Sequence, residues 1–175
     1  MTTTWDAAQI STLLSSAFAP GLASTPKNSS APPTASIDVL ITFDSHGVSG
    51  HANHVSLYHG ARAFVAALVR GRPGWQAPVD LYTLSSVALA RKYTGLLDMV
   101  ATLVAWGLQT PMRNKAHPGG LVFLSGPGGG GVATAWSAMT TAHKSQMAWF
   151  RYGWITLSRY MYMNDLRLDN PRKKS

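Results

Sequence analysis

One stretch, residues 37–70, reads as a strand, a polar loop and a helix, and it constrains the fold more than any other part of the sequence. In IDVLITF, residues 37–43, β-branched residues recur at alternate positions, which predicts a buried or half-buried strand. Gly47 and Gly50 follow and permit turns of the backbone that a Cβ would oppose. Apolar residues at helical spacing then predict a long helix over 53–70. This strand-loop-helix unit favours an open α/β sheet, in which ligands bind at strand ends.

The loop between this strand and this helix gathers the side chains best suited to chemistry: Asp44, His51, Asn53 and His54. His51 and His54 lie three residues apart, so at the start of a helix they share a face and can reach one small site. A catalytic zinc takes three protein ligands, and this pair supplies at most two. Asp44 either adds a carboxylate ligand or orients one of the histidines. The alternative is that the two histidines and Asn53 only cap the helix.

The remainder of the chain alternates helical and strand patterns, which predicts an α/β fold with a parallel or mixed sheet covered by helices on both faces. A chain of 175 residues is long enough for one such domain with its own core. We therefore expect a single domain over residues 1–175, with a flexible insertion loop at 19–36. The other predicted segments are an amphipathic helix at 5–18, strands at 79–84 and 121–124, a mostly helical region at 89–108, and a helical and then aromatic region at 134–166.

The charge balance favours anionic partners. Fifteen Lys and Arg residues stand against seven Asp and no Glu, which gives a net charge of +8. Nucleic acid, a phospholipid surface and a phosphorylated substrate all fit this charge, but no nucleic-acid-reading motif is present, so nucleic acid is the weakest of the three. The absence of cysteine excludes disulfides and thiolate metal sites. No apolar run reaches the ~18 residues of a membrane-spanning helix, so any membrane association is expected from the side.

An aromatic and basic segment near the C-terminus points to a lipid surface. Residues 147–162 contain Arg151 and Arg159 and no acidic residue. Rings mixed with arginine are typical of a membrane interface, because the rings are amphipathic and the cations meet lipid phosphates. A helix that packs these rings into the core is the alternative for most of them. The aromatic residues are Trp149, Phe150, Tyr152, Trp154, Tyr160 and Tyr162.

Two long runs resemble motifs of a known enzyme family. The run TFDSHGVSGHANH, residues 42–54, resembles the third conserved motif of the N-acetylglucosaminylphosphatidylinositol de-N-acetylases, the PIG-L branch of the LmbE-like zinc deacetylases. The run KSQMAWFRYGWITLSRYMYMNDL, residues 144–166, resembles their C-terminal signature. Further similarity at MTTTW and LARKYTGLLD extends the resemblance over most of the chain. It implies a Rossmann-like α/β sandwich with zinc at the strand ends.

The resemblance also implies a role for each residue of the loop. His54 corresponds to a zinc ligand, and His51 to the histidine that stabilises the oxyanion or protonates the leaving amine. Asn53 and Asp44 would support these groups without touching zinc. The implied reaction is attack of zinc-bound water on the acetamide of N-acetylglucosaminyl-phosphatidylinositol, giving acetate and glucosaminyl-phosphatidylinositol in GPI-anchor biosynthesis. The implied location is the cytosolic face of the endoplasmic reticulum membrane.

The sequence departs from the family pattern in one respect. The remaining zinc ligands and the general-base aspartate of the family lie in a His-Pro-Asp-Asp motif after the first strand, and this sequence has none; the run that begins at His117, HPGG, lacks both aspartates. We therefore expect a C-terminal portion without its first strand, from a truncated gene model, splice form or fragment, and inactive on its own. The alternatives are a deacetylase of another N-acetyl sugar and a non-catalytic accessory module at the membrane surface.

Overall fold

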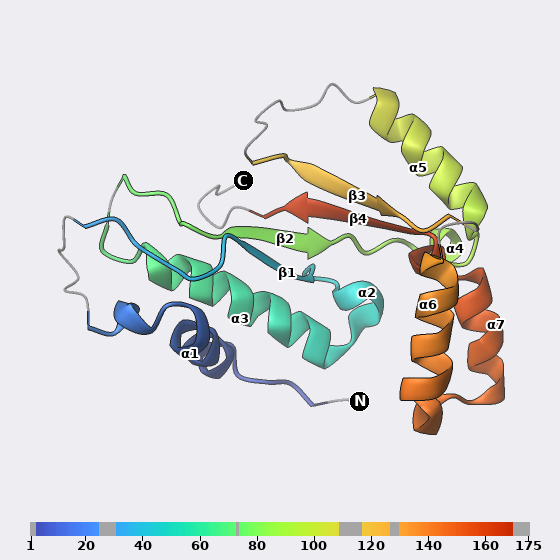
Figure 1. Ribbon diagram of the computed structural model, residues 1–175, viewed down its shortest axis with the longest axis horizontal. Helices are drawn as coiled ribbons and strands as arrows, with labels where there is room; N and C mark the ends of the chain where they lie inside the picture. The colour runs from blue at the N-terminus through green and yellow to red at the C-terminus, as the bar shows by residue number, and fades with distance from the viewer. Residues whose placement is uncertain (1–2, 25–30, 73, 109–116, 127–129, 170–175) are drawn as a thin grey trace. The chain divides into compact units, whose positions relative to one another are not determined.

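The computed structural model describes residues 3–24, 31–72, 74–108, 117–126 and 130–169. They form an α/β structure around a mixed sheet of four strands in the order β1-β2-β4-β3 (Figure 1). The chain divides into two compact units, and the division falls inside β4, Met163–Leu168. Unit 1 comprises residues 1–86, 115–120 and 166–175, and unit 2 comprises residues 87–114 and 121–165. Each unit is described separately below.

Unit 1 is built on the predicted strand-loop-helix. Strand β1, Val39–Phe43, lies parallel to β2, Asp80–Leu84, and the end of β4 runs antiparallel to β2. Helix α3, Ala52–Leu68, connects the two parallel strands and packs against them together with α1, Ala7–Phe18 (Figure 1). The predicted strands at 37–43 and 79–84 and the helices at 5–18 and 53–70 are thereby confirmed, with bounds shifted by one to two residues.

The core of unit 1 lies between α3 and one face of the sheet. Phe64, Val65 and Leu68 of α3 meet Leu81 of β2 in a buried cluster, and Leu14 and Phe18 of α1 pack against that cluster. The two helices approach so closely that a Cβ on Gly60 of α3 would lie 2.3 Å from Cγ2 of Ile10 on α1. Helix α1 begins after Asp6, whose carboxylate accepts a hydrogen bond from the N–H of Gln9 at 2.8 Å.

The other face of β1 does not follow the prediction that helices cover both faces of the sheet. Successive side chains of a strand point to opposite faces. Leu40 points toward the core, whereas Val39 and Ile41 are exposed. In the described part of unit 1, the prediction of a fully covered sheet is therefore wrong at β1.

Local structure holds the two described ends of the region at 19–36. Residues Pro20–Leu22 form a 3₁₀ turn, η1, directly after α1. The backbone N–H of Ser36 donates to the carbonyl of Phe18 at 2.7 Å, which closes the loop at its base. Residues 25–30 lie outside the described residues, so the predicted flexibility of this loop stays a prediction.

Unit 2 consists of short helices and strand β3, Gly120–Leu124, which confirms the strand predicted at 121–124. The predicted helical region at 89–108 forms two helices, α4 and α5, and Gly95, with a φ of +49°, lies between them. Beyond β3, the region predicted as helical and then aromatic at 134–166 is helical in its first part, and its last residues belong to β4, which begins at Met163. The helices are α4 (Leu89–Lys92), α5 (Leu96–Leu108), α6 (Gly131–Ser137) with the π-helical turn Ala138–Ala142, α7 (Trp149–Leu157), and the 3₁₀ turns Lys144–Gln146 and η4 (Arg159–Met161).

A buried ion network holds unit 2 together. Asp98 of α5 binds Arg91 at 2.6 Å from Oδ1 to Nε, and Arg159 at 2.9 Å from Oδ2 to Nε. Arg159 also binds Asp165, at 3.1 Å from Nη2 to Oδ1, and its side chain is only 1% exposed. Thr102 accepts a hydrogen bond from Nη2 of Arg91 at 2.9 Å. The hydrogen bond from Arg91 to Asp98 raises the pKa of the Arg91 guanidinium, so this group stays charged.

Alkaline pH is expected to destabilise unit 1 through Tyr82. Its buried hydroxyl donates to the carbonyl of Pro118 at 2.7 Å, and burial, followed by the negative charge of Asp80, raises the Tyr82 pKa above 10.0. The unfolded chain loses this proton near pH 10 while the folded chain keeps it. The free energy of unfolding should therefore fall as the pH rises above about 10.

Urea unfolding of the wild type and Tyr82→Phe at neutral pH and above pH 10 tests this expectation. The variant should lose about 1 kcal/mol at neutral pH, because the hydrogen bond is absent, and should show a shallower alkaline decline. The raised pKa of Tyr58 and the lowered pKa of Lys92 are common to both proteins, so their effects cancel in the difference. Identical alkaline slopes would contradict the prediction.

Candidate functional site

The predicted site loop lies at the carboxyl end of β1 and turns sharply into α3. Its short helical turn α2, Gly47–Gly50, contains three residues with positive φ: Gly47 at +59°, Gly50 at +70°, and Val48, which carries a Cβ, at +64°. A non-glycine residue in this region is strained and needs support from its surroundings. Part of that support is a hydrogen bond of 2.8 Å from the N–H of Val48 to Oγ of Ser86.

Asp44 organises this loop through four hydrogen bonds. Its Oδ1 accepts from the backbone N–H groups of His46, at 3.0 Å, and Gly47, at 3.1 Å. The same oxygen accepts from the hydroxyl of Ser86 at 2.6 Å, and Oδ2 accepts from the N–H of Ser86, also at 2.6 Å. With both oxygens occupied by loop donors, the geometry favours the supporting role for Asp44 over the role of third metal ligand.

Ser86 is the residue that the sequence patterns do not single out. It follows the end of β2, the parallel neighbour of β1, so the carboxyl ends of the two strands place Ser86 beside Asp44 across 42 residues of sequence. The sequence does contain one signal for this residue, because the serine pair Ser85 and Ser86 directly follows a predicted strand. It has no meaning until the pairing of β1 and β2 is known.

His54 is held in one orientation. Its Nδ1 lies 3.0 Å from the carbonyl oxygen of Gly47, and its ring stacks on Phe43 with 3.8 Å between ring centroids and 5° between planes. An Nδ1–H donated to a carbonyl leaves Nε2 as the free lone pair, which is how proteins prepare a histidine to bind a metal. Among the four predicted site residues, the half-buried His54 therefore has the orientation best suited to a metal ligand.

His51 and Asn53 lie beside His54. The ring of His51 is exposed and meets the His54 ring edge to face, with 5.0 Å between centroids. His51 is the N-cap of α3, and Oδ1 of Asn53 accepts a hydrogen bond from the N–H of His54 at 3.1 Å. Asp44 and His51 thus lie in the loop, with His51 exposed, and Asn53 and His54 lie in the first turn of α3.

A complete zinc site does not form from the described residues alone. Within them, no group of three or more His, Asp, Glu or Cys side chains is placed to hold a metal ion. His51 and His54 offer two imidazoles, whereas a catalytic zinc takes three protein ligands. The loop thus fits part of a metal site.

His117, the start of the HPGG run, belongs elsewhere. Its Nδ1 lies 2.6 Å from Oδ2 of Asp80, the first residue of β2. Ser86 lies beyond the other end of β2, six residues further along the chain, or roughly 20 Å at the rise of a strand. His117 therefore does not contribute to the Asp44 loop.

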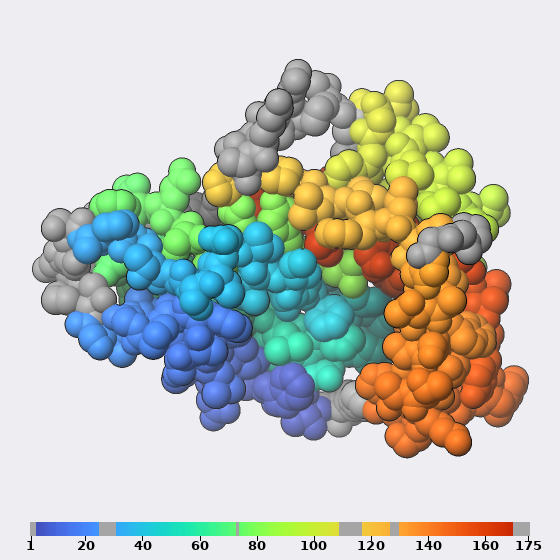
Figure 2. All heavy atoms as spheres, in the orientation of Figure 1, coloured from blue at the N-terminus to red at the C-terminus, as the bar shows by residue number. Residues whose placement is uncertain are grey.

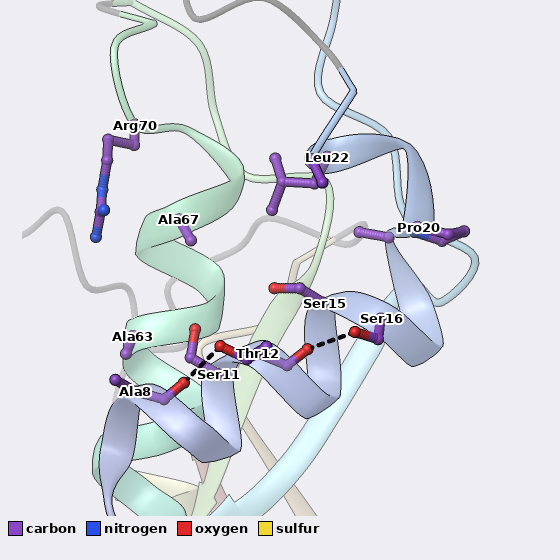
Figure 3. A pocket seen from close by; sticks show the side chains of 12 residues that line it. Ala8, Ser11, Thr12, Ser15, Ser16, Pro20, Leu22, Ala63, Ala67 and Arg70 are labelled. Atoms are coloured by element: carbon purple, nitrogen blue, oxygen red, sulfur yellow. Dashed lines mark hydrogen bonds between the residues drawn. The ribbon is translucent and has the colours of Figure 1, made fainter.

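A hollow in unit 1 is also separate from the loop. A cavity of about 400 Å³ lies between α1, η1 and α3 and is edged by Arg70 (Figure 3). Two of its hydroxyls are already engaged: Thr12 donates to the carbonyl of Ala8 and Ser16 to that of Thr12. None of the predicted site residues lines it.

A histidine loop at the carboxyl end of a parallel strand in a mixed sheet defines an α/β protein with a candidate ligand site at a strand end. The sequence comparisons name the family. The chain is 46% identical to N-acetylglucosaminyl-phosphatidylinositol de-N-acetylase of Arthroderma benhamiae over 95% of this chain and 56% of that protein. It belongs to the family of the N-acetylglucosaminyl-phosphatidylinositol de-N-acetylases, as its motifs indicate.

More distant relatives carry the same name. The chain is 38% identical to a probable N-acetylglucosaminyl-phosphatidylinositol de-N-acetylase of Schizosaccharomyces pombe, over 75% of this chain and 46% of that protein. It is 36% identical to the de-N-acetylase of Bos taurus, over 74% of this chain and 44% of that protein. The chain thus spans about half the length of the curated relatives it matches. No family model matches the sequence, and no solved structure matches it.

Proposed function

We propose that this chain supplies the histidine loop of an N-acetylglucosaminyl-phosphatidylinositol de-N-acetylase. The reaction is hydrolysis of the N-acetyl group to give acetate and glucosaminyl-phosphatidylinositol, a step of GPI-anchor biosynthesis. The observation that carries the proposal is the fixed orientation of His54, set by Gly47 and Phe43 in a chain that belongs to this family. An unrelated helix cap would not need a histidine held from two sides.

We further propose that His54 Nε2 is one ligand of a zinc ion. Bound zinc would polarise the acetamide carbonyl and lower the pKa of its water. The described residues do not complete its coordination, so the roles assigned here are confined to the chain's own groups. In this proposal exposed His51 exchanges a proton with the reacting amide, and Asn53 and Asp44 support the backbone that carries both histidines.

A chimera tests the catalytic proposal. This chain would replace the homologous segment of the Arthroderma benhamiae relative, and acetate release from N-acetylglucosaminyl-phosphatidylinositol would be measured. His54→Ala should abolish activity, and His51→Ala should lower it roughly 10²–10⁴-fold, the range for loss of a general acid or base. His59→Ala, at an exposed position of α3 outside the loop, is the matched control and should leave activity unchanged.

Two outcomes would contradict these assignments. Activity that survives His54→Ala would show that this histidine is not essential. The chain without the rest of the relative should release no acetate and bind zinc weakly, since it offers at most two imidazoles. Stoichiometric tight zinc binding by the chain alone, together with acetate release, would overturn the assignment of a partial site.

The third part of the proposal is association with the cytosolic face of the endoplasmic reticulum membrane. Helix α7 exposes Trp149, at 86%, together with Trp154 and Leu157; it contains Arg151, and exposed Lys144 precedes it in the turn Lys144–Gln146. Exposed indoles with cations fit the level of the lipid headgroups. In the described part of the chain no helix is long and apolar enough to cross a bilayer, so this contact is proposed from the side.

A non-catalytic accessory module is the second candidate function, because the exposed aromatic face of α7 needs no metal. Binding of the chain to phosphatidylinositol-containing vesicles that survives His51→Ala and His54→Ala, together with an active His54→Ala chimera, would favour this candidate. Vesicle binding together with an inactive His54→Ala chimera would favour the enzyme.

A further inference from the structure

Helix α5, Leu96–Leu108, buries its polar side chains and exposes apolar ones, which is the reverse of a surface helix in a water-soluble protein. Its two most polar side chains, Asp98 and Thr102, lie one turn apart and are buried. They face the guanidinium groups of Arg91 and Arg159, at 2.6 Å and 2.9 Å from the Asp98 carboxylate. An amphipathic helix of a soluble domain normally places its polar side chains outward.

The outward side of α5 is apolar. Leu97, Val100, Val104 and Leu108 are all exposed, Leu97 at 77% and Leu108 at 82%. Their spacing of three, four and four residues places them in one stripe along the helix. The yellow-green atoms in the space-filling view are those of α5 (Figure 2). A continuous apolar surface of this kind marks a site of interaction with a membrane or another protein.

The charges of unit 2 favour a lipid surface over a protein partner. Its two acidic residues in the described part of the chain, Asp98 and Asp165, are both buried in the ion network. The side chain of Arg91 is half exposed, Lys144 is exposed, and Arg151 is partly exposed. The accessible charge of the described part of unit 2 is therefore positive, which complements anionic phospholipids.

The length of α5 decides how it would meet a bilayer. Thirteen residues at 1.5 Å each give a helix of about 20 Å, too short for a hydrocarbon core of about 30 Å. A helix with one apolar stripe instead lies in the plane of the interface with that stripe among the upper acyl chains. The contacts of Asp98 with Arg91 and Arg159 fix the rotation of the helix, so the stripe stays outward.

We infer that α5 docks onto an anionic phospholipid bilayer, with Leu97, Val100, Val104 and Leu108 inserted at the edge of the acyl region. The inference rests on the membrane association proposed above and deepens it, because it names a second contact that penetrates below the level of the headgroups. The buried ion network then contributes to membrane binding, because it keeps the polar side chains of α5 away from the lipid.

Single cysteines provide the test, because the wild-type chain has none. Val104→Cys on the stripe and the matched control Leu13→Cys, at an exposed position of α1, would each carry an environment-sensitive fluorophore. Vesicles of phosphatidylinositol and phosphatidylcholine, with and without acyl-chain quenchers, would be added to the full chain. The probe at Val104 should shift to the blue and be quenched, and the probe at Leu13 should do neither.

A second variant measures the strength of insertion. Val100→Ser with Val104→Ser removes four methyl groups from the stripe and adds two hydroxyls, and each CH₂ withdrawn from lipid lowers partitioning roughly fourfold. We expect the partition of the double variant into anionic vesicles to fall by at least tenfold, with its far-UV circular dichroism unchanged. Ala133→Ser, on an exposed position of α6, should leave partitioning unchanged.

The outcomes separate the two proposals. Vesicle binding without a response of the Val104 probe, or with unchanged partition of the double variant, would overturn insertion of α5 and leave the surface contact of α7 intact. Absence of vesicle binding by the wild type would overturn both. A blue shift of the Val104 probe that depends on the protein concentration and not on the lipid concentration would show that the stripe contacts another protein. That result would overturn the inference.

Discussion

Replacing Arg159 with methionine is expected to lower the free energy of unfolding by about 3–5 kcal/mol. The side chain of Arg159 is 1% exposed and lies between Asp98 and Asp165, at 2.9 Å and 3.1 Å. Methionine fills a similar volume but leaves Asp165 without this cation and Asp98 with Arg91 alone. The loss comes from uncompensated buried carboxylates, since the net value of an intact buried ion pair is small. Urea unfolding of the full chain, followed by circular dichroism, measures it.

The control variant is Lys144→Met, which removes an exposed cation from the same unit and should change stability by no more than about 0.5 kcal/mol. The triple variant Arg159→Met, Asp98→Asn and Asp165→Asn should be less destabilised than Arg159→Met, because no unpaired buried charge remains. A loss for Arg159→Met equal to that of Lys144→Met would show that the network is not buried in solution.

The local part of this fold follows from the sequence. The β-branched alternation at 37–43, the glycines of the loop and the helical spacing at 53–70 are short-range signals, and β1 and α3 appear where these signals place them. The same holds for β2 at Asp80–Leu84. Local preference and tertiary context agree in this part of the chain, which is the condition under which periodicity predicts structure well.

Strand β4 shows where such signals fail. Met163, Asp165 and Leu166 are buried, and Asp165 is buried because Arg159 binds it. In the sequence, an aspartate beside an asparagine at the end of an aromatic run has no strand pattern, so no strand is predicted there. The strand is set by pairing with β2, from Tyr82 with Leu168 to Leu84 with Leu166, and that information is long-range.

For helix α5, the sequence-based expectation is incomplete for a different reason. Its helical spacing is visible in the sequence, and the structure confirms a helix, but the rule that apolar faces point inward would turn it the wrong way. Asp98 is drawn inward by two arginines, one of them 61 residues later in the chain. The sequence therefore predicts the type of this element, and only the tertiary ion pairs determine which face is buried.

For the site, the sequence indicates which residues lie near one another but not the role of each. The sequence places Asp44, His51, Asn53 and His54 within eleven residues, and in the structure they lie in the loop and the first turn of α3. The choice between ligand and support for Asp44 depends on Ser86, which is 42 residues away. That choice was open in the sequence, and the strand pairing favours the support role.

Replacing Asp44 with alanine is expected to cost about 2–3 kcal/mol of stability and to disorder the loop. The carboxylate accepts from the N–H groups of His46, Gly47 and Ser86 and from the Ser86 hydroxyl. Hydrogen bonds to a charged group are each worth about 1.5–3 kcal/mol, but the four share one acceptor and water reaches the exposed ones, so the total stays near the value of one or two. Amide hydrogen exchange should show lost protection at Gly47 and Ser86.

The same variant should lower acetate release by the chimera about 10²-fold, although Asp44 touches neither metal nor substrate in this assignment. The carbonyl of Gly47 orients His54, so a loop released from Asp44 no longer fixes that ring. Ser86→Ala removes one of the four hydrogen bonds and should give a smaller loss of both stability and activity. Asp38→Ala, at an exposed position just before β1, should change neither. Loss of activity in Asp44→Ala with full protection of the Gly47 amide would assign the carboxylate to the chemistry itself, and would restore it as a candidate ligand.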